Sequence, residues 1–243
     1  MDTVRYFEFD FLWNRLLEKA APKCYLDVSS PRVVPLLVLE QMKAGEATLV
    51  NPDSADLGTT RELFEQCGLA TRCAFRGDRV EGLSLPEGSF DLITCISVIE
   101  HIPALGDLAA IEKLWELLAP GGTLLLSVPC ARSAFEEYLD FDEYHLQEGT
   151  EAGYFFGQRF YDEPLLAERI FSITGSPVRT EVYGEKTAGF FFQNRAEKFG
   201  NPNYPTWREP YIMGQEFAAY DSVCSLPGCG VVALEFVKPS QAV

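Results

Sequence analysis

The fold is decided by two neighbouring segments, LPEGSFDLITCISVIEHIP (residues 85–103) and LWELLAPGGTLLLSVP (residues 114–129). Within the first, SFDLITCISV is an uninterrupted apolar run of the kind that a parallel sheet buries on both faces. It leads into EHIPALGDLAAIEKLWELLAPGG, whose apolar spacing predicts a helix closed by proline and glycine. TLLLSVP predicts the next strand. This order of strand, helix and strand indicates a parallel pair joined by a crossover helix.

The same alternation continues on both sides of these segments. Upstream, CYLDV, ATLVNP and RCAFRGD predict strands, separated by the predicted helices VVPLLVLEQM and TTRELFEQC (residues 59–67). Downstream, YDEPLLAERIFSITG predicts a helix, and PVRTEVYGE and GCGVVALEFVK predict the last two strands. The sequence therefore predicts an α/β fold with a doubly wound, mostly parallel sheet. Ligands on such sheets bind beyond the carboxyl ends of the strands.

The chain divides into a short leading segment and one domain. Residues 1–22 carry apolar side chains at helical spacing and predict an N-terminal helical cap over the sheet or the active site. Residues 23–243 form the predicted domain. Residues 130–160, rich in Phe, Tyr, Asp and Glu, predict a lid, and residues 186–228 predict an insertion, because plain connections are shorter. The aromatics of these two segments fit an acceptor pocket, a second core or a dimer interface equally well.

The composition of the chain limits which binding partners and cellular locations are expected. The chain has 36 acidic and 20 basic residues, a formal net charge of -16, so a nucleic-acid partner is not expected. No apolar stretch approaches the roughly 20 residues that span a bilayer, and the N-terminus lacks the features of a signal peptide. We expect a cytoplasmic protein. The seven cysteines lie in or beside apolar runs and indicate buried thiols, and no metal site is expected.

The two deciding segments resemble the class I S-adenosylmethionine (SAM) methyltransferase family, and the resemblance covers roughly residues 23–130. The strand that ends in Glu100 and His101 looks like the family's fourth strand, and the strand after the Pro-Gly-Gly turn looks like its fifth. The resemblance implies a Rossmann-like, seven-stranded sheet with an antiparallel last strand, and SAM as the cofactor. A dehydrogenase-type doubly wound fold is the alternative.

The family's first motif is an aspartate-containing strand followed by a glycine-rich loop. The strand YLDV supplies Asp27, but the positions where glycines would fall hold Ser29, Pro31 and Val33. Proline has a fixed φ and no N–H, so it neither takes a glycine-only shape nor donates to a ligand. Two consequences stay open. Either the hydroxyls of Ser29 and Ser30 act where glycine N–H groups normally do, or the SAM site is closed or repurposed.

Other positions that match the family's cofactor site follow the next strands. Asn51 matches the acid that binds the ribose hydroxyls, with Asp53 two residues on, and the alternative is an ordinary Asn-Pro-Asp turn. Asp78 resembles the position that accepts from the adenine amino group, and its alternative is a solvated turn acid. Ser97, after the fourth strand, is expected to line the cofactor.

The resemblance implies methyl transfer to oxygen or nitrogen of a small metabolite or sugar-like acceptor. Removal of a proton from that acceptor needs a base, and the candidates are the two histidines, His145 in the lid and His101, with His145 favoured. The competing hypothesis is a catalytically silent relative that serves in binding or assembly. A third is an enzyme that uses this pocket for different chemistry. A homodimer is a candidate assembly.

Overall fold

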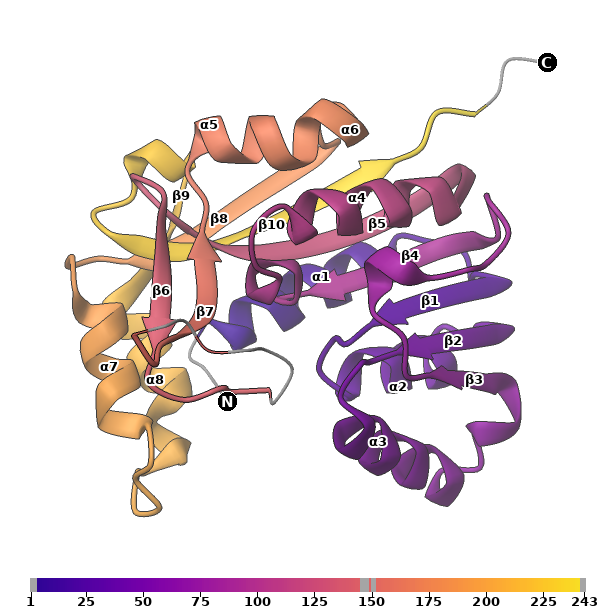
Figure 1. The fold of residues 1–243 in the computed structure, drawn as a ribbon, viewed down its shortest axis with the longest axis horizontal. Coiled ribbons are helices and arrows are strands. Elements are labelled where there is room, and N and C mark those ends of the chain that lie inside the picture. Colours follow the sequence, from indigo (N-terminus) through magenta and orange to yellow (C-terminus); the bar gives the residue numbers. More distant parts are fainter. Residues whose placement is uncertain (1–3, 145–148, 150–151, 241–243) are drawn as a thin grey trace.

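An eight-stranded mixed sheet forms the centre of the structure (Figure 1). This computed structural model describes residues 4–144, 149 and 152–240. The strands, in sheet order, are β3 (Cys73–Arg76), β2 (Glu46–Val50), β1 (Cys24–Val28), β4 (Phe90–Ile96), β5 (Leu118–Ala131), β10 (Cys229–Val237), β8 (Arg179–Glu185) and β9 (Phe217–Tyr220). The first five are parallel, whereas β10 is antiparallel to both of its neighbours. The predicted mostly parallel sheet with an antiparallel last strand is confirmed.

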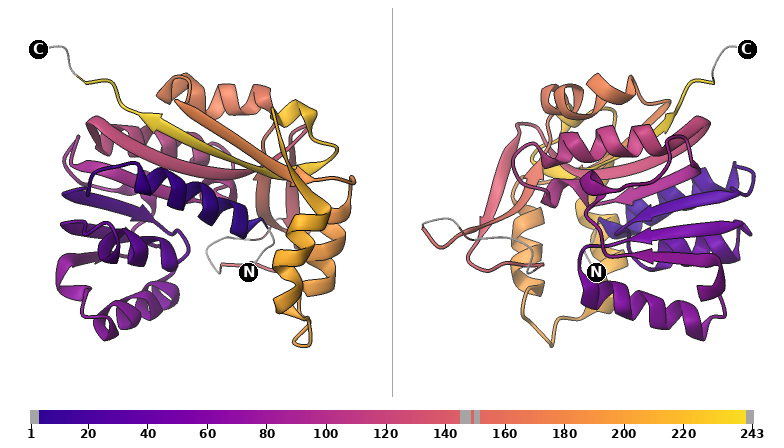
Figure 2. Two further views of the ribbon diagram at one scale, coloured as in Figure 1. Left: turned by 180° about the vertical axis from the view of Figure 1, so that it is seen from behind. Right: turned by 45° about the vertical axis from the view of Figure 1, so that its right-hand side comes forward.

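Helices cover both faces of this sheet, as Figures 1 and 2 show. One face carries α1, α2 and α3, and the other carries α4 and the segment from α5 to α6. The helices are α1 (Arg5–Leu17), α2 (Val33–Glu40), α3 (Ser54–Gln66), α4 (Gly106–Leu117), α5 (Glu163–Leu166), α6 (Ser172–Thr174), α7 (Phe190–Lys198) and α8 (Glu209–Glu216). A π-helical turn joins α5 to α6. Within the described ranges, none of these helices is both long enough and apolar enough to cross a bilayer.

The apolar run of β4 explains why the sheet is covered on both sides. Leu92 and Ile96 pack in the cluster beneath α1, α2 and α3, whereas Ile93 and Cys95 pack in the cluster beneath α4. All four are almost fully buried, because successive side chains of a strand point to opposite faces. A strand without polar alternation therefore requires two layers of helices, which is the doubly wound arrangement.

The sheet has one strand more than the seven predicted. The extra strand, β9, lies inside the predicted insertion 186–228 and pairs antiparallel with β8. Its four residues, FAAY, are too few to show a period. The predicted start of the helix at residues 59–67 is also wrong, because α3 begins at Ser54, where Asp53 caps it.

Two elaborations stand beside each other at one end of the sheet (Figure 1). The hairpin of β6 (Phe135–Leu139) and β7 (Phe155–Phe160) lies in the predicted lid, and α7 and α8 lie in the predicted insertion. Phe160, Phe191 and Phe217 share a small apolar cluster that joins the two. Of the roles considered for the aromatic residues of these segments, these three rings therefore form a second hydrophobic core.

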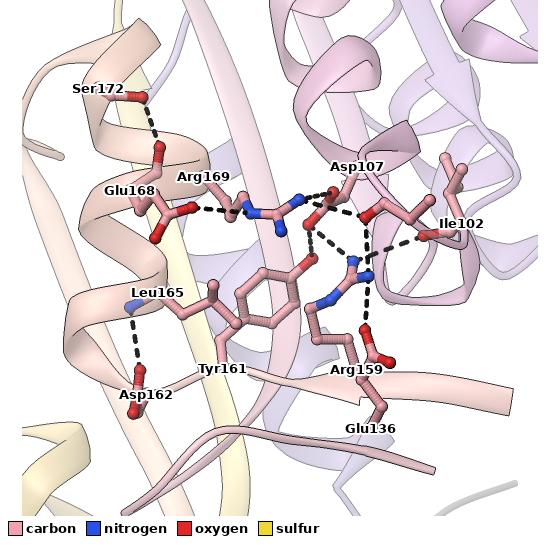
Figure 3. A network of polar contacts seen from close by, with 11 residues as sticks. Ile102, Asp107, Glu136, Arg159, Tyr161, Asp162, Leu165, Glu168, Arg169 and Ser172 are labelled. Carbon is pink, nitrogen blue, oxygen red and sulfur yellow. Dashed lines mark hydrogen bonds and ion pairs between the residues drawn. The ribbon is translucent and has the colours of Figure 1, made fainter. Parts of the chain in front are cut away.

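Asp107, in the first turn of α4, is the centre of a buried polar network that holds the hairpin (Figure 3). Its carboxylate accepts from the Tyr161 hydroxyl at 2.9 Å and forms ion pairs with Arg159 at 2.8 Å and Arg169 at 3.0 Å. Arg159, on β7, also donates to the carbonyl oxygen of Ala104 at 3.0 Å. Since Ala104 and Asp107 follow β4 closely, the network fixes the turn after β4 against the hairpin.

Candidate active site

A cavity of about 490 Å³ lies beyond the carboxyl ends of β1, β2 and β4. Its volume falls in the range of roughly 300–1,000 Å³ that small-molecule sites occupy. Five of the residues predicted for the site line it together: Ser29, Asn51, Asp53, Ser97 and His101. The cavity is therefore at the place where doubly wound sheets bind their ligands.

Asp27 and Ser30 lie behind the first loop and are not among the lining residues. Oδ1 of Asp27 accepts from the hydroxyls of Thr94 at 2.7 Å and Tyr25 at 3.1 Å, and Oδ2 accepts from the backbone N–H of Ser30 at 3.3 Å. Burial raises the pKa of Asp27 to about 6. The Ser30 hydroxyl accepts from the N–H of Ile96 at 3.3 Å. Both side chains thus brace the loop from the core side.

Ser29 takes the backbone shape that glycine adopts most readily, with φ at 47°. Its N–H and its hydroxyl both donate to the carbonyl oxygen of Val50, at 2.9 Å and 3.1 Å. The loop therefore keeps a left-handed bend at the first of the three glycine positions. Pro31 does not line the cavity. Pro35 is the third residue of α2, where the N–H has no acceptor within the helix, so the helix accommodates it.

Substitutions at Ser29 test whether this bend matters. Ser29→Gly is expected to keep the loop and to change the free energy of unfolding by no more than about 1 kcal/mol, because glycine has no steric penalty at positive φ. Ser29→Val is expected to destabilise the protein by about 2 kcal/mol, because a β-branched residue is poorly tolerated there. Urea denaturation of the two variants provides the comparison. Equal stabilities of the glycine and valine variants would contradict the assigned backbone shape.

The loop after β2 combines a turn with a half-buried carboxylate. Oδ1 of Asn51 accepts from the N–H of Asp53 at 2.9 Å, and its amide donates to Asp56 at 2.8 Å. Oδ1 of Asp53 caps α3 by accepting from the N–H groups of Ala55 at 2.9 Å and Asp56 at 3.1 Å. Among the described residues, Oδ2 of Asp53 makes no hydrogen bond. The Asn-Pro-Asp turn is present, and one carboxylate oxygen stays available at the cavity wall.

The charge of the cavity is negative. Asp78 is not among the lining residues and forms an ion pair with Arg76 at 2.8 Å. The charged lining residues are Asp53, Asp56, Glu81 and Glu143, against Arg79. An excess of carboxylates in a cavity favours a positively charged ligand.

Ser97 links the end of β4 to the N-terminal helix. Its backbone is left-handed, with φ at 52°, and strained backbone of this kind concentrates at functional sites. Its hydroxyl donates to the carboxylate of Glu8, which also accepts from the Ser127 hydroxyl at 2.6 Å and pairs with Arg5 at 2.9 Å. Helix α1 is therefore anchored to the turn that lines the cavity.

His101 is held as a neutral imidazole. Its Nδ1–H donates to the carbonyl oxygen of Gly157 on β7 at 2.7 Å, so Nε2 is the acceptor, and the Tyr144 hydroxyl donates to it at 3.3 Å. Burial lowers the pKa of His101 to about 4. The other predicted base, His145, lies outside the described residues.

A second, smaller cavity of about 150 Å³ adjoins the first. Four residues line both cavities: Ser97, His101, Glu143 and Tyr144. The smaller cavity is enclosed by α1, the turn after β4, β7, α7 and β10, and its polar lining includes Arg5, Glu100, Gln158 and Arg195. Two neighbouring cavities of unequal size, with shared wall residues, suit a cofactor and a smaller second reactant.

Several lining residues escaped the sequence analysis. Arg5 belongs to α1, whose buried face holds Glu8, Phe11, Leu12, Arg15 and Leu16. A charged residue on the buried face of an amphipathic helix is a signal for a specific polar partner, and Glu8 has that position. Val80 and Arg195 carry no comparable signal, because the folding of the chain alone brings them to the cavities.

Comparison with known sequences gives one family and a set of partial relatives. The sequence model of a family described as "Methyltransferase domain" matches residues 6–165. The ubiquinone biosynthesis O-methyltransferase of Xanthomonas campestris pv. campestris is 46% identical over 54 residues, which are 22% of this chain and 22% of that protein. The chain thus matches about a fifth of the length of this curated relative.

Comparison with solved structures extends over most of the chain. The [4+2]-cyclase SpnF matches 96% of this chain and 80% of its own, with a TM-score of 0.60 and 16% identity. The geranyl diphosphate C-methyltransferase of Streptomyces coelicolor A3(2), in complex with Mg²⁺, geranyl diphosphate and S-adenosyl-L-homocysteine, matches 94% of this chain and 76% of its own, with a TM-score of 0.59 and 9% identity. At these identities the likeness concerns the fold.

Proposed function

The chain belongs to the methyltransferase-domain family, and we propose that it is a methyltransferase that transfers a methyl group from SAM to oxygen or nitrogen of a small-molecule acceptor. The observation that carries the proposal is the 490 Å³ cavity beyond β1, β2 and β4, with the Asp53 carboxylate on its wall. The acceptor's reacting atom then belongs beside Ser97 and His101, where the two cavities meet.

The residues of the larger cavity fit SAM. SAM supplies a methyl group that the positive charge on sulfur already activates. Oδ2 of Asp53 is placed to accept from a ribose hydroxyl, and Val28, Val50 and Val80 offer an apolar wall for an adenine ring. The carboxylates of the lining favour a cationic ligand.

The residues predicted to bind the cofactor fall into two groups, those that line the cavity and those that do not. Ser29, Asn51 and Ser97 line the cavity with Asp53, so contact with SAM is proposed for all four. Asp27 and Ser30 are proposed to act by holding the loop. A contact of Asp78 with the adenine amino group stays a prediction.

The cofactor site is tested by calorimetric titration with SAM and with S-adenosylhomocysteine. Asp53→Ala is expected to weaken both affinities by about tenfold or more, the size of a lost charged hydrogen bond. Asp221→Ala, which removes an exposed acid outside both cavities, is the matched control and is expected to bind like the wild type. Unchanged affinity in the Asp53 variant would show that the ribose binds elsewhere. Absence of binding by the wild type would favour the silent-relative hypothesis, which the glycine-free loop supports.

A further inference from the structure

A buried carboxyl group with one unpartnered oxygen lines the smaller cavity. Glu100 lines this cavity and is only 1% exposed, and its Oε2 has no hydrogen-bond partner among the described residues. A buried polar atom without a partner costs roughly 1–3 kcal/mol, and more when it belongs to a group that ionises. Such an atom, in a residue that lines a cavity, indicates a ligand that completes its hydrogen bonding.

The geometry points to the smaller cavity as the acceptor subsite and to Glu100 as the group that binds the acceptor's hydroxyl and takes its proton. This inference rests on the proposed function, because it places the acceptor beside a SAM-filled larger cavity. It assigns to Glu100 the role for which the sequence suggested His145 or His101.

The mixed charge of the lining selects a neutral acceptor. An ammonium group would meet Arg5 and Arg195, and a carboxylate would meet Glu100 and Glu143. A hydroxyl group avoids both repulsions, because it is neutral and both donates and accepts hydrogen bonds. A cavity of about 150 Å³ is the size that holds a benzene ring, so the part of the acceptor that enters is no larger than one six-membered ring.

The proposed step balances in atoms and charge. The acceptor O–H bond breaks as its proton moves to the Glu100 carboxylate, and a lone pair of that oxygen forms the new O–C bond to the methyl group. The C–S bond of SAM breaks, and its electron pair stays on sulfur. The products are the methyl ether, S-adenosylhomocysteine and a protonated Glu100, which returns the proton to water when the product leaves.

The surroundings of Glu100 suit this role better than those of His101. The groups that face Glu100 are Arg5 and Glu8 from α1, Cys95 from β4, His101 beside it and Tyr144. Burial, with a smaller contribution from Glu8, raises the pKa of Glu100 to about 8. A base near the working pH is more effective than His101, whose pKa of about 4 makes it a weak proton acceptor.

The test measures methyl transfer from tritiated SAM by the full chain to phenol, cyclohexanol and aniline between about pH 5.5 and 9. For the wild type, kcat/KM for a hydroxyl probe is expected to rise with pH and to pass its half-maximal value near pH 8. Glu100→Gln is expected to lower kcat by about 10²- to 10⁴-fold and to abolish the rising limb, with an unchanged Kd for SAM. Glu100→Asp is expected to recover part of the rate and the limb. Glu112→Gln, the same change at an exposed position of α4, is the control.

Each of the other possible results contradicts one specific part of this proposal. A retained rate and rising limb in Glu100→Gln would remove Glu100 as the base. Transfer to aniline alone would overturn the hydroxyl assignment. SAM binding without transfer to any probe would overturn the ring-sized acceptor subsite. A wild type that binds no SAM would instead contradict the proposed function, so the two failures are distinct.

Discussion

Asp107→Ala is expected to lower the free energy of unfolding by about 3–5 kcal/mol, because removal of one partner leaves buried charges uncompensated. The carboxylate is 1% exposed and pairs with Arg159, which is 2% exposed, and with Arg169. It also accepts from the Tyr161 hydroxyl. Three side chains therefore lose their common acceptor in this variant, and two of them carry positive charge.

Urea denaturation followed by circular dichroism measures this loss. Glu112→Ala, on the exposed face of the same helix, is the control and is expected to stay within about 0.5 kcal/mol of the wild type. Since the network also fixes the turn that carries His101, Asp107→Ala is expected to loosen that ring. A stability loss below about 1 kcal/mol would show that the arginines find other partners.

Glu100→Gln is expected to be more stable than the wild type at neutral pH. The pKa of Glu100 rises from 4.5 to about 8 on folding, so between these values the unfolded chain releases a proton that the folded chain keeps. Wild-type stability therefore falls as pH rises through this window. At pH 7 the difference corresponds to about 3 kcal/mol in favour of the glutamine variant.

The measurement is the difference in unfolding free energy between Glu100→Gln and the wild type from about pH 4.5 to 9. This difference is expected to grow with pH and to level off above about 8. His101 contributes with the opposite sign, because its lowered pKa costs stability as pH falls below 6.5, but it is present in both proteins. A difference that does not change with pH would mean that Glu100 ionises normally. A stabilising substitution that abolishes activity is typical of a functional site.

Much of the fold could be predicted because its signals are local. The unbroken apolar run that becomes β4 requires two helix layers, and the turn after it identifies the family. The strand β9 and the early start of α3 at Ser54 could not be predicted in the same way. The first is too short to show a period. The second depends on Asp53, which the sequence presents as a ribose ligand or as part of an Asn-Pro-Asp turn, whereas in the structure it caps α3.

The candidate site was predictable only where it follows the strands. Ser29, Asn51 and Ser97 each directly follow the last residue of a strand, so topology alone brings them to the cavity. Arg5 and Arg195 reach the smaller cavity from helices that are distant in the sequence. The basicity of Glu100 also lies outside sequence analysis, because it arises from burial that only the assembled fold creates.

The contacts of Glu8 set an order of assembly. Its carboxylate accepts from Ser97 and Ser127, which follow it by 89 and 119 positions. During synthesis the first helix leaves the ribosome long before those serines are made. Until then the carboxylate of Glu8 is exposed to water. Contacts so distant along the chain form slowly, because a long loop has to close first. The pocket is therefore sealed only after the middle of the sheet is complete, so that docking of the N-terminal helix is a late step in folding.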